Sequence, residues 1–171
     1  MKRLAAALLC LLPLFLHAED KTLSVGGFSF VLAAPWTQGQ NTGMMTKAVL
    51  NYPAEGESPL QAKVYDFGGP SGGIDANVQR WIAQFEGTPE VKKEELTFGT
   101  TKVVLVTASG TYLDGMPGGP KTPKPESTLM GAIVAGTDSN VFFKMAGPKA
   151  PMAKAQADFK KLVVSPFGKQ G

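Results

Sequence analysis

The stretch Leu129-Met130-Gly131-Ala132-Ile133-Val134 carries no charged or polar side chain at any position. A strand with one face in water alternates apolar and polar residues, whereas a strand covered on both faces is apolar throughout. The run Val103-Val104-Leu105-Val106 has the same character. We therefore expect both segments to be central strands of a sheet that needs a covering layer on each face.

Turn residues divide much of the remaining chain into further strands that would pair as antiparallel hairpins. Gly26-Gly27, for instance, can adopt the positive φ angles of a tight turn between two short apolar segments. Leu60, Ala62 and Val64 alternate with Gln61, Lys63 and Tyr65, as a strand with one buried face requires. The strands expected in this way cover residues 23–25, 28–30, 47–52, 60–67, 92–98, 101–108, 128–135 and 141–145.

Two segments have apolar residues at helical spacing. The first runs from residue 75 to about 85 and has an apolar stripe of Ile74, Val78, Trp81, Ile82 and Phe85. We expect Asp75 to cap its N-terminus and Gly87-Thr88-Pro89 to end it. The second runs from about 150 to 163, with an apolar face of Met152, Ala155, Phe159, Leu162 and Val163. The prediction is an α+β domain whose antiparallel sheet has one helix on each face.

The order of these elements resembles the PsbP-like α/β/α fold. The shared features are a Gly-Gly hairpin, Pro35-Trp36 shortly after it, a helix in mid-chain, paired strands and a terminal helix with the pattern Ala157-Asp158-Phe159-Lys160-Lys161-Leu162. Residues 72–85 and 141–148 are also similar to small secreted bacterial proteins without an assigned activity. The resemblance implies a fold and an accessory or binding role, and it supplies no catalytic residues.

Residues 1–18 have the pattern of a secretory signal peptide. Lys2 and Arg3 precede an apolar run at residues 4–16, and Ala18 is a small residue suited to cleavage before Glu19. The run holds 13 residues, whereas a membrane-spanning helix needs about 20. We therefore expect one α+β domain at residues 19–171, exported to the periplasm or the extracellular space without a stable membrane span.

Removal of the signal restricts the chemistry of the domain. Cys10 and His17 are the only cysteine and the only histidine. Without them the mature chain cannot build a Ser-His-Asp triad, a Cys-His pair or the usual zinc or haem ligation. The basic residues fall from 17 to 15 against 14 acidic ones, so the net charge falls from +3 to +1. A nearly neutral domain lacks the basic excess of a nucleic-acid binder, and we expect no cofactor.

A glycine-rich segment at residues 66–75 joins a predicted strand to the first helix. Backbone N–H groups at such a loop can hold an anion, so the candidate ligand-binding residues here are Asp66, Gly69, Ser71, Gly72 and Asp75. The loop has neither a Gly-Lys-Ser/Thr ending nor a G-x-G-x-x-G pattern, which argues against nucleotide binding. The competing interpretations are a structural turn, and a calcium ion shared by Asp66 and Asp75.

Residues 114–126 form a second irregular segment, rich in glycine and proline, with Lys121 as its candidate binding residue. Its Lys-Thr-Pro-Lys-Pro portion favours an extended conformation that a partner can grip at low entropic cost. The competing interpretation is a solvent-exposed loop. Trp36 completes the candidate set, since it either faces a ligand cleft or packs beneath the sheet edge.

Three functions fit these features. The leading interpretation is a non-catalytic exported domain that binds an envelope protein or a small ligand. The alternative is a hydrolase that uses carboxylates or a Ser-Lys pair, with Asp66, Asp75, Asp114 and Lys121 gathered where the two irregular loops meet. A further alternative is an oxygen-ligated calcium-binding domain.

Overall fold

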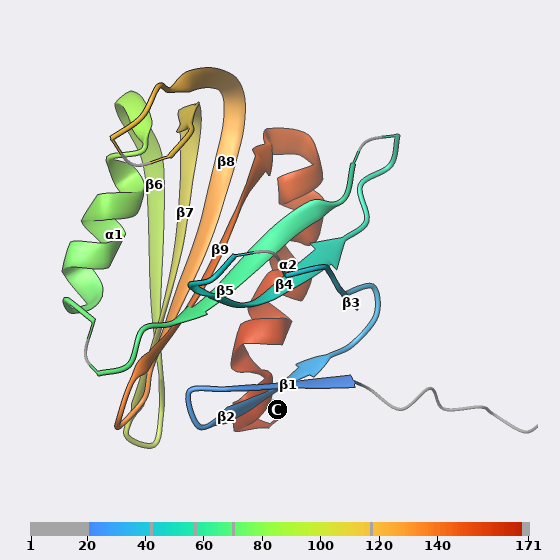
Figure 1. Cartoon of the computed structure of the whole chain (residues 1–171), viewed down its shortest axis with the longest axis vertical. Coiled ribbons are helices and arrows are strands. Elements are labelled where there is room, and N and C mark those ends of the chain that lie inside the picture. The colour runs from blue at the N-terminus through green and yellow to red at the C-terminus, as the bar shows by residue number, and fades with distance from the viewer. Residues whose placement is uncertain (1–20, 42, 57, 70, 117, 169–171) are drawn as a thin grey trace, which may run out of the picture.

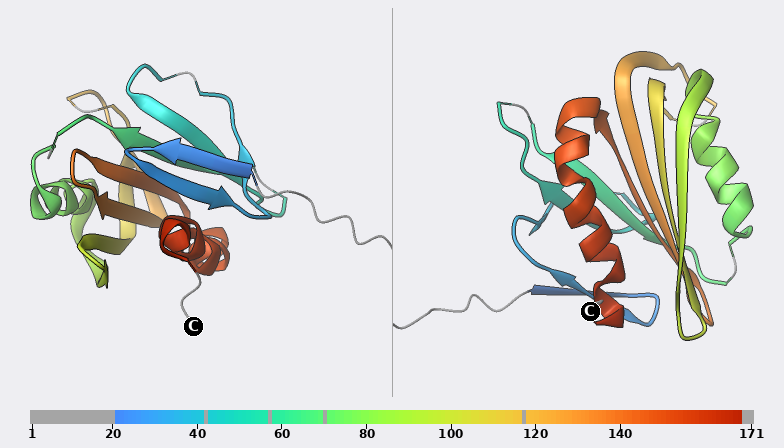
Figure 2. Two further views of the ribbon diagram at one scale, coloured as in Figure 1. Left: turned by 90° about the horizontal axis from the view of Figure 1, so that it is seen from below. Right: turned by 180° about the vertical axis from the view of Figure 1, so that it is seen from behind.

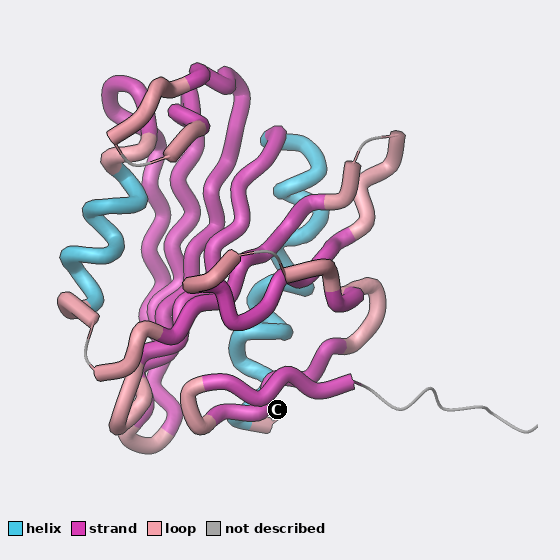
Figure 3. The backbone as a smooth tube through the Cα atoms, viewed as in Figure 1, coloured by secondary structure: helices cyan, strands magenta, loops and turns pink. Residues whose placement is uncertain are grey.

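The computed structural model describes residues 21–41, 43–56, 58–69, 71–116 and 118–168. The predicted signal at residues 1–18 lies outside these ranges, as do Pro70 and Pro117 of the two irregular loops. The described chain forms a seven-stranded antiparallel sheet, a separate two-stranded hairpin and two α-helices (Figures 1 and 3). The elements are β1 (Lys21–Val25), β2 (Phe28–Leu32), β3 (Thr37–Gln38), β4 (Thr46–Tyr52), β5 (Leu60–Asp66), α1 (Ile74–Ile82), β6 (Phe85–Phe98), β7 (Thr101–Asp114), β8 (Thr122–Ala135), β9 (Asn140–Pro148), α2 (Lys149–Val164) and a 3-10 turn at Ser165–Phe167.

The all-apolar stretches lie inside the sheet, as their sequence predicts. The strand order is β3-β4-β5-β9-β8-β7-β6, so β8 is paired on both sides and β7 lies next to it. Val104 pairs with Ile133 and Val103 with Val134, and all four side chains are fully buried. These residues are apolar on both faces because each face of the sheet packs against its own layer.

One face of the sheet is covered by α2 and by the β1–β2 hairpin (Figure 2). Gly26 and Gly27 take positive φ angles in the turn of that hairpin, which confirms the predicted pairing. Phe30 of β2 contacts Phe143 of β9 edge to face, with ring centroids 4.9 Å apart. The buried face of α2 consists of the five predicted residues, Met152, Ala155, Phe159, Leu162 and Val163.

The opposite face is covered by α1, which packs on β6, β7 and β8. Trp81 of α1 lies directly over Gly131 of β8, where a methyl group in place of the glycine hydrogen would come within 2.3 Å of the indole ring. The missing side chain at Gly131 therefore lets α1 approach the sheet closely. The prediction of one helix on each face is confirmed. Neither described helix has the length and apolar character needed to cross a membrane.

The ends of α1 differ from the prediction. Its N-cap is Gly73, which makes no side-chain capping bond, while Asp75 lies in the first turn and pairs with Lys93 of β6 at 3.2 Å. The helix ends at Ile82, and the Gly87-Thr88-Pro89 segment lies inside β6. Pairing of β6 with β7 begins at Phe85, and a register shift between Glu86 and Glu90 accommodates the turn-forming residues as an irregularity in the strand.

The β7–β8 hairpin is longer than predicted. Both strands continue to the Asp114–Thr122 pair, so the expected irregular segment at residues 114–126 shrinks to a loop at residues 115–121. Pro123 and Pro125 lie in the part of β8 that β9 no longer flanks, since the β8–β9 pairing stops at Ser127. Proline is tolerated there because one side of the strand is an open edge.

Candidate functional site

The two irregular loops lie at opposite ends of the sheet (Figure 1). The glycine-rich loop follows Asp66, which lies level with Val103 at the start of β7. The loop at residues 115–121 follows Asp114, which is at the other end of β7. At about 3.3 Å per residue, β7 separates these ends by roughly 36 Å. The hydrolase alternative requires the two loops to meet, and the cluster that it needs does not form among the described residues.

The glycine-rich loop is organised by its own side chains and by α1. Asn77 of α1 is buried and donates from Nδ2 to the carbonyl oxygens of Ser71 at 2.9 Å and Gly73 at 2.7 Å. The Ser71 hydroxyl donates to the Gly68 carbonyl oxygen at 3.0 Å, and the Asp66 carboxylate accepts from the Gly68 N–H at 2.9 Å. These bonds are the pattern of a structural turn.

The other candidates in this region also have structural contacts. Gly69 forms an isolated bridge with Ser139, and Gly72 has a φ of 80°, a conformation that glycine adopts without strain. Asp75 is paired with Lys93. In the parts of the chain that the structure describes, no three acidic side chains gather in a way that could hold a metal ion.

Trp36 packs beneath the sheet edge. Its side chain is 6% exposed, its Nε1 donates to the Asp158 carbonyl oxygen at 3.3 Å, and its ring contacts that of Tyr52 at a centroid distance of 5.0 Å. It also borders a broad, largely apolar depression of about 850 Å³ beside the last turns of α2. The ring therefore joins β4 and α2 through packing and a single hydrogen bond.

A different cavity, of about 530 Å³, lies on the α1 face of the sheet where α1 ends and leaves β5 and β9 open. Strands β5, β7, β8 and β9 supply its walls. We call it the lysine cavity and define it by its lining residues, Gln61, Lys63, Tyr65, Tyr112, Asp114, Lys124, Pro125, Ser127, Lys144, Ala146, Gly147 and Pro148. Its volume lies within the usual range of about 300–1,000 Å³ for small-molecule sites.

Lys144 of β9 is the most constrained polar group of the lysine cavity. Its Nζ donates to Gln84 Oε1 at 2.5 Å and to the Tyr112 hydroxyl at 3.2 Å. The Tyr112 hydroxyl donates to the same Gln84 oxygen at 3.0 Å. Gln84 follows Ala83, the C-cap of α1, and its backbone carbonyl accepts from the Leu113 N–H at 2.7 Å. The end of α1 and strand β7 thus hold the ammonium in place.

The surroundings of Lys144 disfavour its charge. Burial, together with the charges of Lys63 and Lys121, lowers the pKa of Lys144 from 10.5 to about 8, although Asp114 acts in the opposite direction. Burial and the charge of Asp114 raise the pKa of Tyr112. A positive group held in a recess, with a depressed pKa, is a feature typical of functional sites.

Lys63 of β5 is the cross-strand partner of Lys144 on β9. Directly opposed side chains of an antiparallel pair have Cβ atoms about 4.5–5.5 Å apart, and like charges at such positions are destabilising. None of the ion pairs in the described residues involves a lysine that lines this cavity. The pair therefore concentrates positive charge in a recess whose lining contains one acidic residue, Asp114.

Two candidates from the sequence bear on this cavity, since Asp114 lines it and Lys121 acts on it through its charge. The Lys121 Nζ donates to the carbonyl oxygens of Gly115 at 3.1 Å and Met116 at 2.5 Å, which closes the β7–β8 loop on itself. The other candidates, Asp66, Gly69, Ser71, Gly72, Asp75 and Trp36, are not among the residues that line the cavity.

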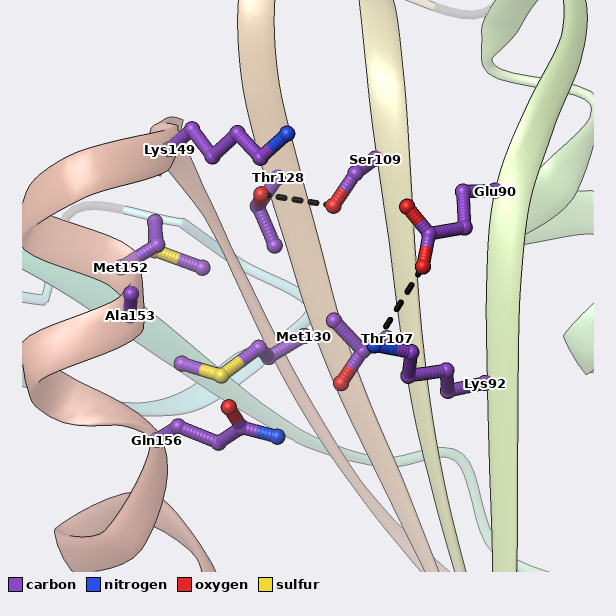
Figure 4. Close-up of a pocket in the computed structure, with 10 residues that line it drawn as sticks. All are labelled: Glu90, Lys92, Thr107, Ser109, Thr128, Met130, Lys149, Met152, Ala153 and Gln156. Carbon is purple, nitrogen blue, oxygen red and sulfur yellow. Dashed lines mark hydrogen bonds and ion pairs between the residues drawn. The ribbon is translucent and has the colours of Figure 1, made fainter.

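A smaller groove of about 190 Å³ lies on the opposite face, between α2 and strands β6 to β8 (Figure 4). Several of its polar groups bond to each other. Ser109 and Thr128 share a hydrogen bond of 2.9 Å, and Lys92 pairs with Glu90 at 3.3 Å. With these groups paired and its volume below the usual range of small-molecule sites, the groove is the weaker candidate.

Apart from Asp114, the residues that line the lysine cavity were not selected from the sequence, although one signal was present. Lys144 is the single charged residue in the otherwise apolar run at residues 141–146. Burying a charge is costly unless a partner compensates for it, so a lysine at this point of a central strand indicates a special environment. Lys63 gave no such signal, because it occupies an ordinary polar position of an alternating strand.

Comparison with known proteins bears on the fold. The solved structures include a similar one, the solution structure of cyanobacterial PsbP (CyanoP) from Synechocystis sp. PCC 6803, with a TM-score of 0.57 and 12% sequence identity. The similarity covers 91% of this chain and 96% of that chain. The fold is PsbP-like. No protein-family model matches this PsbP-like chain, and no curated protein matches it in sequence. At this level of identity the likeness concerns the fold, and function must be argued from the site.

Proposed function

We propose that the protein is an exported, non-catalytic domain that binds a small ligand in the lysine cavity. The observation that carries this proposal is the recess itself, in which Lys144 and Tyr112 present polar groups beside the apolar surfaces of Pro125, Ala146 and Pro148. Ligand sites typically combine such apolar walls with a few fixed polar groups. The lack of histidine and cysteine after residue 18 supports a binding role over the usual catalytic designs.

Ligand binding can be tested with a variant that fills the cavity. We expect fragments from a mixed charged and neutral set to shift the amide NMR signals of Tyr65, Tyr112 and Lys144 in the domain at residues 19–171. Ala146→Leu places a larger side chain in the cavity wall and should abolish these shifts. Ala153→Leu, in the groove on the opposite face, is the matched control and should leave them unchanged. Absence of any shift at the cavity, or equal binding by both variants, would overturn the proposal.

Export is supported by the charge and hydropathy pattern of residues 1–18. We expect the protein recovered from the envelope or the medium of its native cells to begin at or near Glu19 when its intact mass is measured. A protein that keeps residues 1–18 would contradict this part of the proposal without affecting the ligand site.

A further inference from the structure

The ammonium of Lys144 has one donor left for a ligand. An ammonium carries three N–H groups, and two of them donate to Gln84 Oε1 and the Tyr112 hydroxyl. Among the described residues no third hydrogen-bond partner and no carboxylate within ion-pair distance accompanies them. A charged group in this position is incompletely compensated by the protein itself.

Lys63 adds a second positive charge next to the first. The two lysines are directly paired across β5 and β9, on the face of the sheet that forms the floor of the lysine cavity. Lys124 lines the same recess, and Asp114 is the one acidic side chain that lines it. Low-dielectric walls focus the field of such charges and attract ligands of the opposite sign.

The remaining walls indicate the rest of the ligand. Tyr65 and Tyr112 contribute aromatic rings, and Pro125, Ala146 and Pro148 contribute apolar surface. A bare inorganic ion would leave most of this cavity of about 530 Å³ unfilled. A small organic molecule can place an anionic group at the lysines and its apolar part against these walls.

We infer that the lysine cavity binds a soluble organic anion, whose carboxylate or phosphate group lies between Lys144 and Lys63. This inference rests on the proposed small-ligand function and adds the charge of the ligand. An oxygen of the anion accepts a hydrogen bond from the free N–H of Lys144, and its negative charge offsets the repulsion between the two lysines.

The test compares probes that differ in charge but hardly in shape. Benzoate and benzamide are titrated into the domain at residues 19–171 and followed by NMR shifts at Tyr112 and Lys144, with phenyl phosphate and inorganic phosphate as further probes. We expect benzoate and phenyl phosphate to bind at least about tenfold more tightly than benzamide, because a hydrogen bond between two charged groups is stronger than one to a neutral amide.

Three lysine variants locate the anion. Lys144→Met and Lys63→Met should each weaken benzoate binding about tenfold or more and leave benzamide unaffected, since methionine keeps an apolar side chain but removes the charge. Lys92→Met, on the opposite face of the sheet, should leave both affinities unchanged. Because Lys63 is exposed, its variant tests the inference even where Lys144→Met lowers stability.

The possible failures are distinguishable. Binding of neutral fragments in the cavity without any preference for anions would overturn the inference and leave the proposed function standing. If nothing binds there, both fail. Binding confined to vesicles of phosphatidylglycerol, with none to phosphatidylcholine vesicles or to the soluble probes, would also overturn the inference, because the recognised group would then belong to a membrane surface.

Discussion

Lys144 is placed in its recess by the residues beside it. Val141, Phe142, Phe143 and Met145 are buried on one face of the sheet or the other, and their packing fixes the position of β9. The Lys144 side chain therefore points to the α1 face of the sheet, although burial there disfavours its charge. The hydrogen bonds to Gln84 and Tyr112 reduce this cost without neutralising the charge.

The pKa of Lys144 predicts how stability depends on pH. In the folded state this pKa is about 8, against a reference value of 10.5, so the unfolded chain binds more protons between these values and stability rises with pH across that window. Below pH 8 both states are charged and the full cost of burial applies. We expect wild type to gain about 2 kcal/mol relative to Lys144→Met between pH 7 and pH 9.5.

Urea denaturation of both proteins at the two pH values measures this gain. The other charged groups around the recess are present in both proteins, so the difference between the two curves reports Lys144. A difference that stays constant with pH would contradict the shifted pKa.

Gly131 is a second residue whose role is set by a neighbour far away in the sequence. Gly131→Ala would place its methyl carbon 2.3 Å from the ring of Trp81, and the buried indole has little room to move. We expect a loss of about 1–3 kcal/mol in the free energy of unfolding. Gly110→Ala in β7 is the control, because its methyl group would meet Phe85 at an ordinary 3.5 Å. Equal stability of the two variants would refute the close approach of α1.

At the scale of elements, α2 is joined to β4 by a hydrogen bond as well as by apolar packing. The Tyr52 hydroxyl donates to Asp158 Oδ2 at 2.9 Å, and burial, followed by this bond, raises the pKa of Tyr52. Tyr52→Phe should lower the free energy of unfolding by about 1–2 kcal/mol in thermal or chemical denaturation. Asp158→Asn keeps an acceptor oxygen and should cost less; a larger loss for Asp158→Asn would argue against this bond as the main link.

The apolar patterns predicted the elements better than the turn residues predicted their ends. The stripe of α2 matched its buried face residue for residue, because a single helix face meets a single core. Gly87-Thr88-Pro89 does not end the strand, because pairing of β6 with β7 on both sides of this segment outweighs a local turn preference. Pro123 and Pro125 indicated an irregular segment but lie in β8, because an open strand edge tolerates residues without an N–H group.

At the scale of the molecule, two apolar cores share one sheet, and each holds one tryptophan. Trp36 lies in the core beneath α2, and Trp81 lies in the core beneath α1. Residues of β8 contribute to both cores, with Met130 on one side and Leu129 on the other. Loss of either core would expose the shared strand, so the two should unfold together.

Single-tryptophan variants test this cooperativity. Trp36→Phe leaves Trp81 to report the core beneath α1, and Trp81→Phe leaves Trp36 to report the core beneath α2. Within each variant we expect fluorescence and far-ultraviolet circular dichroism to give the same urea midpoint. Separate midpoints within one variant would show that the cores unfold independently.

The sequence by itself determined the α+β class, the central strands, the buried face of α2 and the expectation of a signal at residues 1–18. These features follow from hydrophobic periodicity and local composition, which act over a few neighbouring residues. Only the tertiary structure decided that the irregular loops lie apart and that Lys63, Tyr112 and Lys144 share a recess. Strand order and register bring these residues together from distant parts of the chain, and neither quantity is encoded by the period of any single strand.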